Sequence, residues 1–294
     1  MYGWCAVLDK CITSFNMPLF FMISGFLFWG TKRDSLEIIS NKFKRLMIPY
    51  LCVMGIILVC KVFLPASLSY HKMDDWGYLI DILVFGGERW FVYVLFLVFC
   101  IMALMKKWLN PLWVVLLMLL SVGLTIFVKL PSWLLCGRVV RFLFFFLLGG
   151  LYKQYYDLLY PFMIKYRWVF YTIFIICNVV FVRELVPIHF LMKFILPVIG
   201  CSVFFILSDQ LVTWQKKKGD NFIFKYLRYA GKYSLQFYLL SFAFPIIRYA
   251  IITVLKITNP YMIVFLIMIL QLIAITIIIE LTKRIKFLKI PLGY

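Results

Sequence analysis

Residues 14–28 read SFNMPLFFMISGFLF, and this stretch indicates the class of fold. It is apolar over most of its length, as expected for a helix that crosses a bilayer, which needs about 20 mostly apolar residues. We expect Pro18 to open this helix, since proline is tolerated in a first turn, and Asn16 either to cap it or to line a polar cavity. The pair Ser24 and Gly25 predicts close packing against another helix.

Apolar runs of this kind recur along the whole chain. Of the 294 residues, 65% are hydrophobic and only 15% are charged, which is far from the composition of a soluble domain. The sequence therefore predicts one integral membrane domain over residues 1–294, an all-α polytopic bundle of transmembrane helices. Nine spans are predicted, at 12–30, 46–64, 90–105, 111–128, 139–153, 167–183, 190–212, 233–252 and 261–281. The apolar stretch 76–85 is too short to span and is predicted to be interfacial or re-entrant.

The net charge of the chain is +19, and the positions of its basic residues indicate the role of this charge. They gather in alternate loops and at the C-terminal end, for example Lys32 and Arg33, Lys106 and Lys107, Lys216 to Lys218, and Lys283 and Arg284. Cytoplasmic loops of membrane proteins are enriched in Lys and Arg. We therefore expect a multi-pass protein of the plasma or inner membrane with a cytoplasmic C-terminus and, for nine spans, an outer N-terminus. Its basic residues are predicted to face membrane lipid rather than nucleic acid.

Polar side chains gather at the predicted outer ends of three spans. They are Asn16 on the first span, Glu88, Arg89 and Trp90 on the third, and Arg138 and Arg141 on the fifth. Arg138 and Arg141 are three residues apart and share a helix face. Arginines from separate helices predict a shared binding site for an anionic or hydroxyl-rich ligand. Snorkelling of Arg to the interface and an interfacial Trp belt explain the same residues without a ligand.

The eighth predicted span carries one polar stripe. Ser234, Tyr238, Ser241, Pro245 and Arg248 follow one another at spacings of four and three residues, which places them on one face of a helix. Such a stripe predicts a polar cavity inside the bundle. Hydrogen bonds between helices, which Ser and Tyr often make in membrane bundles, are the alternative.

A basic segment precedes the second predicted span. Residues 41–50 read NKFKRLMIPY, in which Lys42 and Arg45 share a helix face and Lys44 lies between them. These cations can bind an anion such as a nucleotide phosphate. Positive-inside topology and attraction to anionic lipid account for the same cluster, so both interpretations remain open. Both histidines, His71 and His189, fall in predicted outer loops, and no metal site is predicted.

Five stretches, in order, resemble the motifs of the membrane acyltransferase 3 family, from residue 15 to about residue 282. The first is the Phe-His-Met-Pro-Leu-Phe-Phe…Ser-Gly helix of that family. The matching positions are Phe15, Asn16, Met17, Pro18, Leu19, Phe20, Phe21, Ser24 and Gly25; Lys42, Arg45, Pro49 and Tyr50; RWFVYVLF at 89–96; RFLFFFLLGG at 141–150; and Gly231, Lys232, Ser234, Leu235, Tyr238 and Leu239.

The resemblance implies a fold and an activity. The family has a ten-helix membrane domain that moves acyl groups, usually acetyl from acetyl-CoA, onto hydroxyls of cell-surface glycans and related acceptors. Acyl-CoA, the co-substrate in place of any permanent cofactor, is then expected near Lys42, Lys44 and Arg45. The glycan or lipid-linked sugar is expected near Asn16, Ser24, Arg89, Trp90, Arg138, Arg141 and the stripe Ser234, Tyr238, Ser241 and Arg248.

The chain departs from the family at catalytic positions. Asn16 stands where the family has His, and Ser241 stands where a His often follows the Tyr-Leu-Leu element. The resemblance also implies a preceding helix with an Arg and a His, which this N-terminally short sequence lacks. A general base that titrates near neutral pH is therefore not identified, with Glu88 as a weak candidate. Either that helix is encoded upstream or the protein binds without catalysing. A transporter, flippase or binding protein for lipid-linked sugars is the alternative function.

Overall fold

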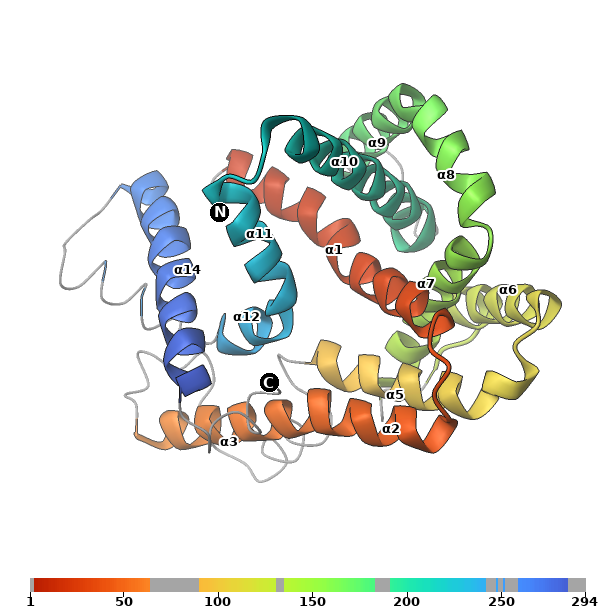
Figure 1. The fold of residues 1–294 in the computed structure, drawn as a ribbon, viewed down its shortest axis with the longest axis horizontal. Helices are drawn as coiled ribbons and strands as arrows, with labels where there is room; N and C mark the ends of the chain where they lie inside the picture. The colour runs from red at the N-terminus through yellow and green to blue at the C-terminus, as the bar shows by residue number, and fades with distance from the viewer. Residues whose placement is uncertain are drawn as a thin grey trace. The chain divides into compact units, whose positions relative to one another are not determined.

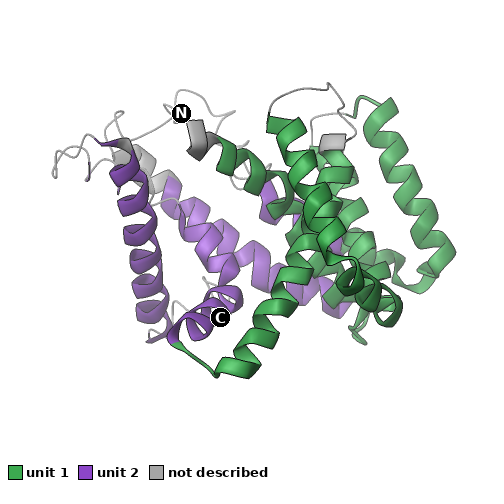
Figure 2. Ribbon diagram, turned by 90° about the horizontal axis from the view of Figure 1, so that it is seen from above, with its two compact units in different colours: residues 1–35, 100–221 green, residues 36–99, 222–294 purple. Residues whose placement is uncertain are grey.

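The computed structural model describes residues 3–63, 90–130, 135–182, 191–241, 247, 251 and 259–284. These residues form helices and their connections, which confirms the predicted all-α class (Figure 1). Contacts divide the chain into two compact units, coloured separately in Figure 2. Unit 1 comprises residues 1–35 and 100–221, and unit 2 comprises residues 36–99 and 222–294.

The helices of each unit follow the chain order. Unit 1 contains α1 (Gly3–Trp29), η3 (Lys106–Trp108), α6 (Pro111–Phe127), α7 (Cys136–Gln154), α8 (Tyr156–Lys165), α9 (Arg167–Val182), the π-helical turn η5 (Leu191–Ile195) and α10 (Leu196–Lys218). Unit 2 contains α2 (Ser35–Lys42), the π-helical turn η1 (Phe43–Met47), α3 (Ile48–Phe63), α11 (Phe222–Lys232), α12 (Ser234–Leu240) and α14 (Pro260–Arg284). Helix α5 (Trp90–Met105) begins in unit 2 and ends in unit 1.

Several helices are long and apolar enough to cross a membrane. Within the described ranges these are Val7–Trp29, Trp90–Trp108, Lys193–Lys218 and Tyr261–Arg284, and α8 with α9 makes a fifth if this pair, bent by 76°, is one span. The membrane character of the chain follows from them. The total of nine spans stays a prediction, because α3 and α6 are shorter than 18 residues. The stretch 76–85 and most of the second half of the eighth span lie outside the described residues.

The expected start of the first span is wrong. Helix α1 begins at Gly3, so Pro18 lies inside it and Asn16 is not its cap. The Oδ1 atom of Asn16 accepts a hydrogen bond from the backbone N–H of Met17 at 2.6 Å. The apolar sequence continues upstream of Pro18, and a chain in hydrocarbon must satisfy its backbone groups within its own helix. This requirement outweighs the local preference of proline for a first turn.

Glycines allow α1 and α7 to touch at their backbones. A Cβ atom on Gly25 would overlap the carbonyl of Phe146, and one on Gly149 would overlap the carbonyl of Met22. Beside this contact the rings of Phe21 and Phe142 stack with centroids 4.5 Å apart. The packing role expected of Gly25 is therefore confirmed.

The two helices run in the same direction. Phe21 meets Phe142, Gly25 lies against Phe146, and the Trp29 ring lies against Gly150, so the contacts advance along both helices together. The first and fifth predicted spans must run the same way if the spans alternate in direction, so the contact order agrees with the predicted topology.

Helix α10 completes the core of unit 1. Gly200 of α10 lies against the Phe15 side chain. A Cβ atom added to Gly200 would lie 2.6 Å from the Cβ atom of Phe15. Further along, the Tyr152 ring of α7 packs on Phe205 with centroids 4.9 Å apart. The buried members of this core are Leu19, Met22, Tyr152, Met163, Cys201 and Ile206.

In unit 2, α2, η1 and α3 form one helical run in line with one another (Figure 1). This run packs against α5 through the rings of Phe43 and Phe96, whose centroids are 5.9 Å apart. Lys42 comes before Phe43, whereas its partner Phe99 comes after Phe96, so the two helical runs are antiparallel. That direction agrees with their place as consecutive predicted spans.

In unit 2, α11 contacts α14 through tyrosine side chains, namely Tyr226, Tyr229 and the following Tyr233. The hydroxyls of Tyr226 and Thr276 lie 3.2 Å apart, and the Lys283 ammonium lies 4.0 Å from the ring centroid of Tyr233. The same ammonium lies 4.5 Å from the ring of Tyr229. Burial raises the pKa of Tyr229 to about 12, so this phenol stays neutral at physiological pH. The basic stretch between the seventh and eighth predicted spans therefore contains a helix with its own packing surface.

We expect Tyr160→Phe to destabilise unit 1 more than Tyr171→Phe. The Tyr160 hydroxyl of α8 donates to the Asp209 carboxylate at 2.5 Å, whereas the Tyr171 hydroxyl of α9 lies 3.1 Å from the Gln210 amide oxygen. A hydrogen bond to a charged group contributes about 1.5–3 kcal/mol and a neutral one about 0.5–1.5 kcal/mol. Thermal unfolding of both variants in the same detergent tests this order. Equal midpoints would contradict it.

Candidate active site

The predicted acyl-CoA residues lie on and beside the π-helical turn of unit 2. Lys44 and Arg45 are exposed, whereas the next two residues, Leu46 and Met47, are buried. The turn thus presents two adjacent cations on one side and anchors itself by two apolar side chains on the other. Single π-helical turns frequently occur at functional sites.

Lys42 has a different environment from its two neighbours. Its ammonium lies 3.9 Å from the centroid of the Phe99 ring, and the residue is half-buried. This cation–π contact holds the stem of Lys42 against α5. Lys44 and Arg45 are therefore the better candidates for binding a phosphate group, with Lys42 supplying charge beside them.

Two groups of predicted acceptor residues meet in unit 2. Tyr238 of α12 contacts Phe91 near the start of α5, with ring centroids 5.3 Å apart. Trp90 precedes Phe91, and the two rings lie 6.4 Å apart. The third and eighth predicted spans thus contact each other through Phe91 and Tyr238. Glu88, Arg89, Pro245 and Arg248 lie outside the described residues.

The serines of the polar stripe are placed at the two ends of α12. Ser234 is its first residue, and Ser241 follows its last residue. The Ser241 hydroxyl donates to the Tyr238 carbonyl at 2.8 Å. This bond lies within one chain segment, so it supports neither the predicted cavity nor the alternative of hydrogen bonds between helices.

The arginine pair lies in the first two turns of α7 in unit 1. Arg138 and Arg141 are both half-buried and share a helix face, as predicted. The guanidinium carbon of Arg141 lies 4.8 Å from the ring centroid of Phe142, which in turn stacks on Phe21. The contact between α1 and α7 therefore fixes the helix segment from which both cations extend.

Asn16 and Ser24 lie on one stripe of α1 with Phe20 between them at four-residue spacing. Phe20 is 40% exposed and Leu27, on the same stripe, is 64% exposed. This stripe differs from the Gly25 side that packs on α7. Gly25 of the Ser24–Gly25 pair supplies the close approach to α7, whereas Ser24 lies on the stripe of Asn16 and Phe20.

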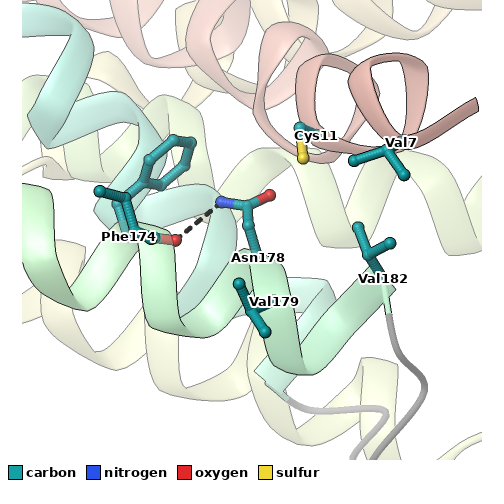
Figure 3. A pocket seen from close by; sticks show the side chains of 7 residues that line it. Val7, Cys11, Phe174, Asn178, Val179 and Val182 are labelled. Atoms are coloured by element: carbon teal, nitrogen blue, oxygen red, sulfur yellow. Dashed lines mark hydrogen bonds between the residues drawn. The ribbon is translucent and has the colours of Figure 1, made fainter. Parts of the chain in front are cut away.

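The structure also reveals buried polar residues that were not predicted from the sequence. Among the described residues they are Ser121, Asn178, Gln236 and Thr282. Ser121 donates to the Val140 carbonyl and Thr282 to the Ile279 carbonyl. Asn178 is 7% exposed and lies on the wall of a cavity (Figure 3). The signal available in the sequence was a single carboxamide inside the apolar run 173–182.

Comparison with known proteins gives one match. A family model described as an acyltransferase domain matches residues 6–281. The curated proteins and the solved structures give no significant match to the chain.

Proposed function

Because this chain belongs to the acyltransferase family whose domain spans residues 6–281, we propose that it transfers an acetyl or other acyl group from acyl-CoA to a hydroxyl of a cell-surface glycan or related envelope acceptor. The family match is the observation that carries the proposal. The apolar helices make the protein an integral membrane acyltransferase-like protein, which suits a donor on the cytoplasmic side and an acceptor on the other.

The proposed donor site is the exposed basic pair of the π-helical turn. A CoA phosphate would accept charge-assisted hydrogen bonds from Lys44 and Arg45, and Arg is suited to bidentate binding of phosphate oxygens. Lys42 would add to the positive potential beside them. This position fits the cytoplasmic side, where acyl-CoA is made.

Within unit 1, the proposed acceptor residues are Arg138 and Arg141. Within unit 2, Trp90 and Tyr238 are proposed separately to bind a sugar. Arginine and tyrosine side chains bind hydroxyl-rich and anionic sugars, and an aromatic ring packs on a sugar face. Asn16 retains a carboxamide that can orient a substrate hydroxyl or stabilise an oxyanion, although it cannot take up a proton.

The proposed transfer converts the thioester of acyl-CoA into an ester of the acceptor hydroxyl. The acceptor oxygen bonds to the acyl carbon, the bond from that carbon to the CoA sulfur breaks, and the hydroxyl proton ends on the thiolate. The residues named above bind and orient the two substrates. The group that accepts the hydroxyl proton is not among them.

We expect cells expressing this chain to carry more alkali-labile acetyl ester on their envelope glycans than cells with an empty vector. Arg141→Ala should lower that increment about 10- to 100-fold, since a lost charge-assisted hydrogen bond is worth about 1.5–3 kcal/mol. Lys129→Ala is the matched control, because Lys129 is exposed at the same predicted side and lies outside the arginine pair. Mass spectrometry of released glycans measures the esters, and immunoblotting of membranes measures protein abundance.

Two outcomes contradict parts of this proposal. Equal ester levels for Arg141→Ala and Lys129→Ala at equal protein abundance would remove Arg141 from the acceptor site. Ester levels equal to those of the empty vector, with the protein present in the membrane, would favour the binding or transport function instead.

A further inference from the structure

Unit 1 contains a cavity between the N-terminal part of α1 and the C-terminal half of α9 (Figure 3). Its volume is about 430 Å³, within the range of about 300–1,000 Å³ that small-molecule pockets occupy. Seven side chains line it: Val7, Cys11, Phe174, Ile175, Asn178, Val179 and Val182. Asn178 is the single carboxamide in this apolar wall.

In the carboxamide of Asn178, the nitrogen makes a hydrogen bond, whereas the oxygen makes none with the described residues. Its Nδ2 donates to the carbonyl of Phe174, one turn earlier in α9, at 2.9 Å. Its Oδ1 is buried and has no hydrogen-bond partner among the described residues. Figure 3 shows Oδ1 pointing away from Phe174, to the side on which Cys11 and Val7 lie. Because the nitrogen bond fixes the carboxamide, the cavity presents one hydrogen-bond acceptor and no free amide donor.

An unsatisfied buried acceptor costs about 1–3 kcal/mol, so a ligand that donates to it recovers this free energy. Apart from the weakly polar thiol of Cys11, the remaining wall is aliphatic and aromatic and favours an apolar body. Three wall residues, Val7, Ile175 and Val179, are 40%, 62% and 51% exposed, so the wall continues to the outer surface of unit 1. On a transmembrane segment that surface faces lipid, and the ligand can enter from the bilayer.

We propose that this cavity binds a long-chain membrane alcohol, whose hydroxyl donates to Asn178 Oδ1 while its chain lies on Val7, Phe174 and Val179. This site is separate from the arginine pair and from the basic π-helical turn. It does not depend on acyl transfer, and its occupancy is measurable whether or not the chain is an active transferase.

The test uses the full chain in detergent micelles and a diazirine-bearing long-chain primary alcohol as the probe. Its methyl ether is the comparison, because the ether keeps the chain and oxygen but cannot donate a hydrogen bond. We expect irradiation with the alcohol to label peptides that contain Cys11 or residues 174–182, and the ether to label them about tenfold less. Quantitative peptide mass spectrometry measures the labelling.

Variants separate the hydrogen bond from the cavity. Asn178→Leu keeps the side-chain size and removes the acceptor, so labelling by the alcohol should fall about tenfold to the level of the ether. Val179→Trp should abolish labelling by filling the cavity. Ile176→Trp is its matched control, since Ile176 is 55% exposed on the same helix and does not line the cavity.

Three results would overturn the proposal. Equal labelling by alcohol and ether, or by wild type and Asn178→Leu, would mean that Asn178 does not select a hydroxyl donor and that water satisfies its oxygen. Unchanged labelling in Val179→Trp would place the probe elsewhere on the protein. Absence of label from these peptides in the wild type would mean that the cavity binds no such alcohol.

Discussion

Replacement of Gly25 by alanine is expected to prevent unit 1 from folding correctly. The added Cβ would overlap the backbone carbonyl of Phe146, and neither backbone can move aside without separating α1 from α7. Gly149→Ala is expected to have the same effect, because its Cβ would overlap the carbonyl of Met22. Overpacking of a well-packed core costs about 1–3 kcal/mol, and a backbone clash lies at or above the upper end. We expect loss of at least about 3 kcal/mol, measured as a lowered thermal midpoint and loss of monodisperse protein.

Two other glycines provide the control for this experiment. Gly55 in α3 and Gly123 in α6 lie inside helices, and a Cβ atom on either would meet nothing within 4 Å. Alanine at these positions should leave stability unchanged or raise it by up to about 1 kcal/mol, since alanine is the better helix former. If Gly25→Ala unfolded at the same midpoint as Gly55→Ala, the backbone contact between α1 and α7 would be disproved.

The packing role of Gly25 could be predicted because the signal is local and chemical. Small residues are enriched where membrane helices touch, and the adjacent pair Ser24 and Gly25 follows that pattern. The residues that Gly25 meets on α7 could not be chosen from the sequence. Whether Gly25 lies against Phe146 depends on how far one helix is shifted along the other, and stacked rings such as Phe21 and Phe142 accompany the observed shift.

The expectation for Pro18 shows where a local rule fails. Proline favours a first turn, and Asn16 before it resembled a cap. The helix instead begins at Gly3, because the residues before Pro18 also form an apolar helix and gain from remaining one in the membrane. Asn16 therefore lies inside a helix and does not cap its start.

Asn178 was missed for a different physical reason. In the sequence it is a single carboxamide in an apolar run, and a carboxamide whose Nδ2 bonds one turn back resembles ordinary helix packing. Its significance comes from the unsatisfied Oδ1 and the cavity beside it. Both depend on how α9 is rotated relative to α1, and one sequence does not specify this rotation.

Removal of the exposed basic pair is expected to have the largest effect on donor use. In Lys44→Gln with Arg45→Gln, two charge-assisted hydrogen bonds to a CoA phosphate would be lost, each worth about 1.5–3 kcal/mol. Their joint loss should raise the KM for acyl-CoA at least about 100-fold, while the fold persists because both side chains are exposed. The measurement is transfer of radiolabelled acetyl from acetyl-CoA in proteoliposomes at physiological salt, with Lys42 left in place.

The control for this pair removes equal charge from another exposed segment on the same predicted side. Lys217 and Lys218 lie at the end of α10, and both are exposed. If the π-helical turn binds the phosphate, Lys217→Gln with Lys218→Gln should change the KM less than about threefold, since exposed charges that do not contact the phosphate are screened by salt. If both double variants raised the KM equally, the cytoplasmic surface would attract acyl-CoA only through its overall charge. The turn would then serve membrane topology, as the alternative interpretation of residues 41–50 holds.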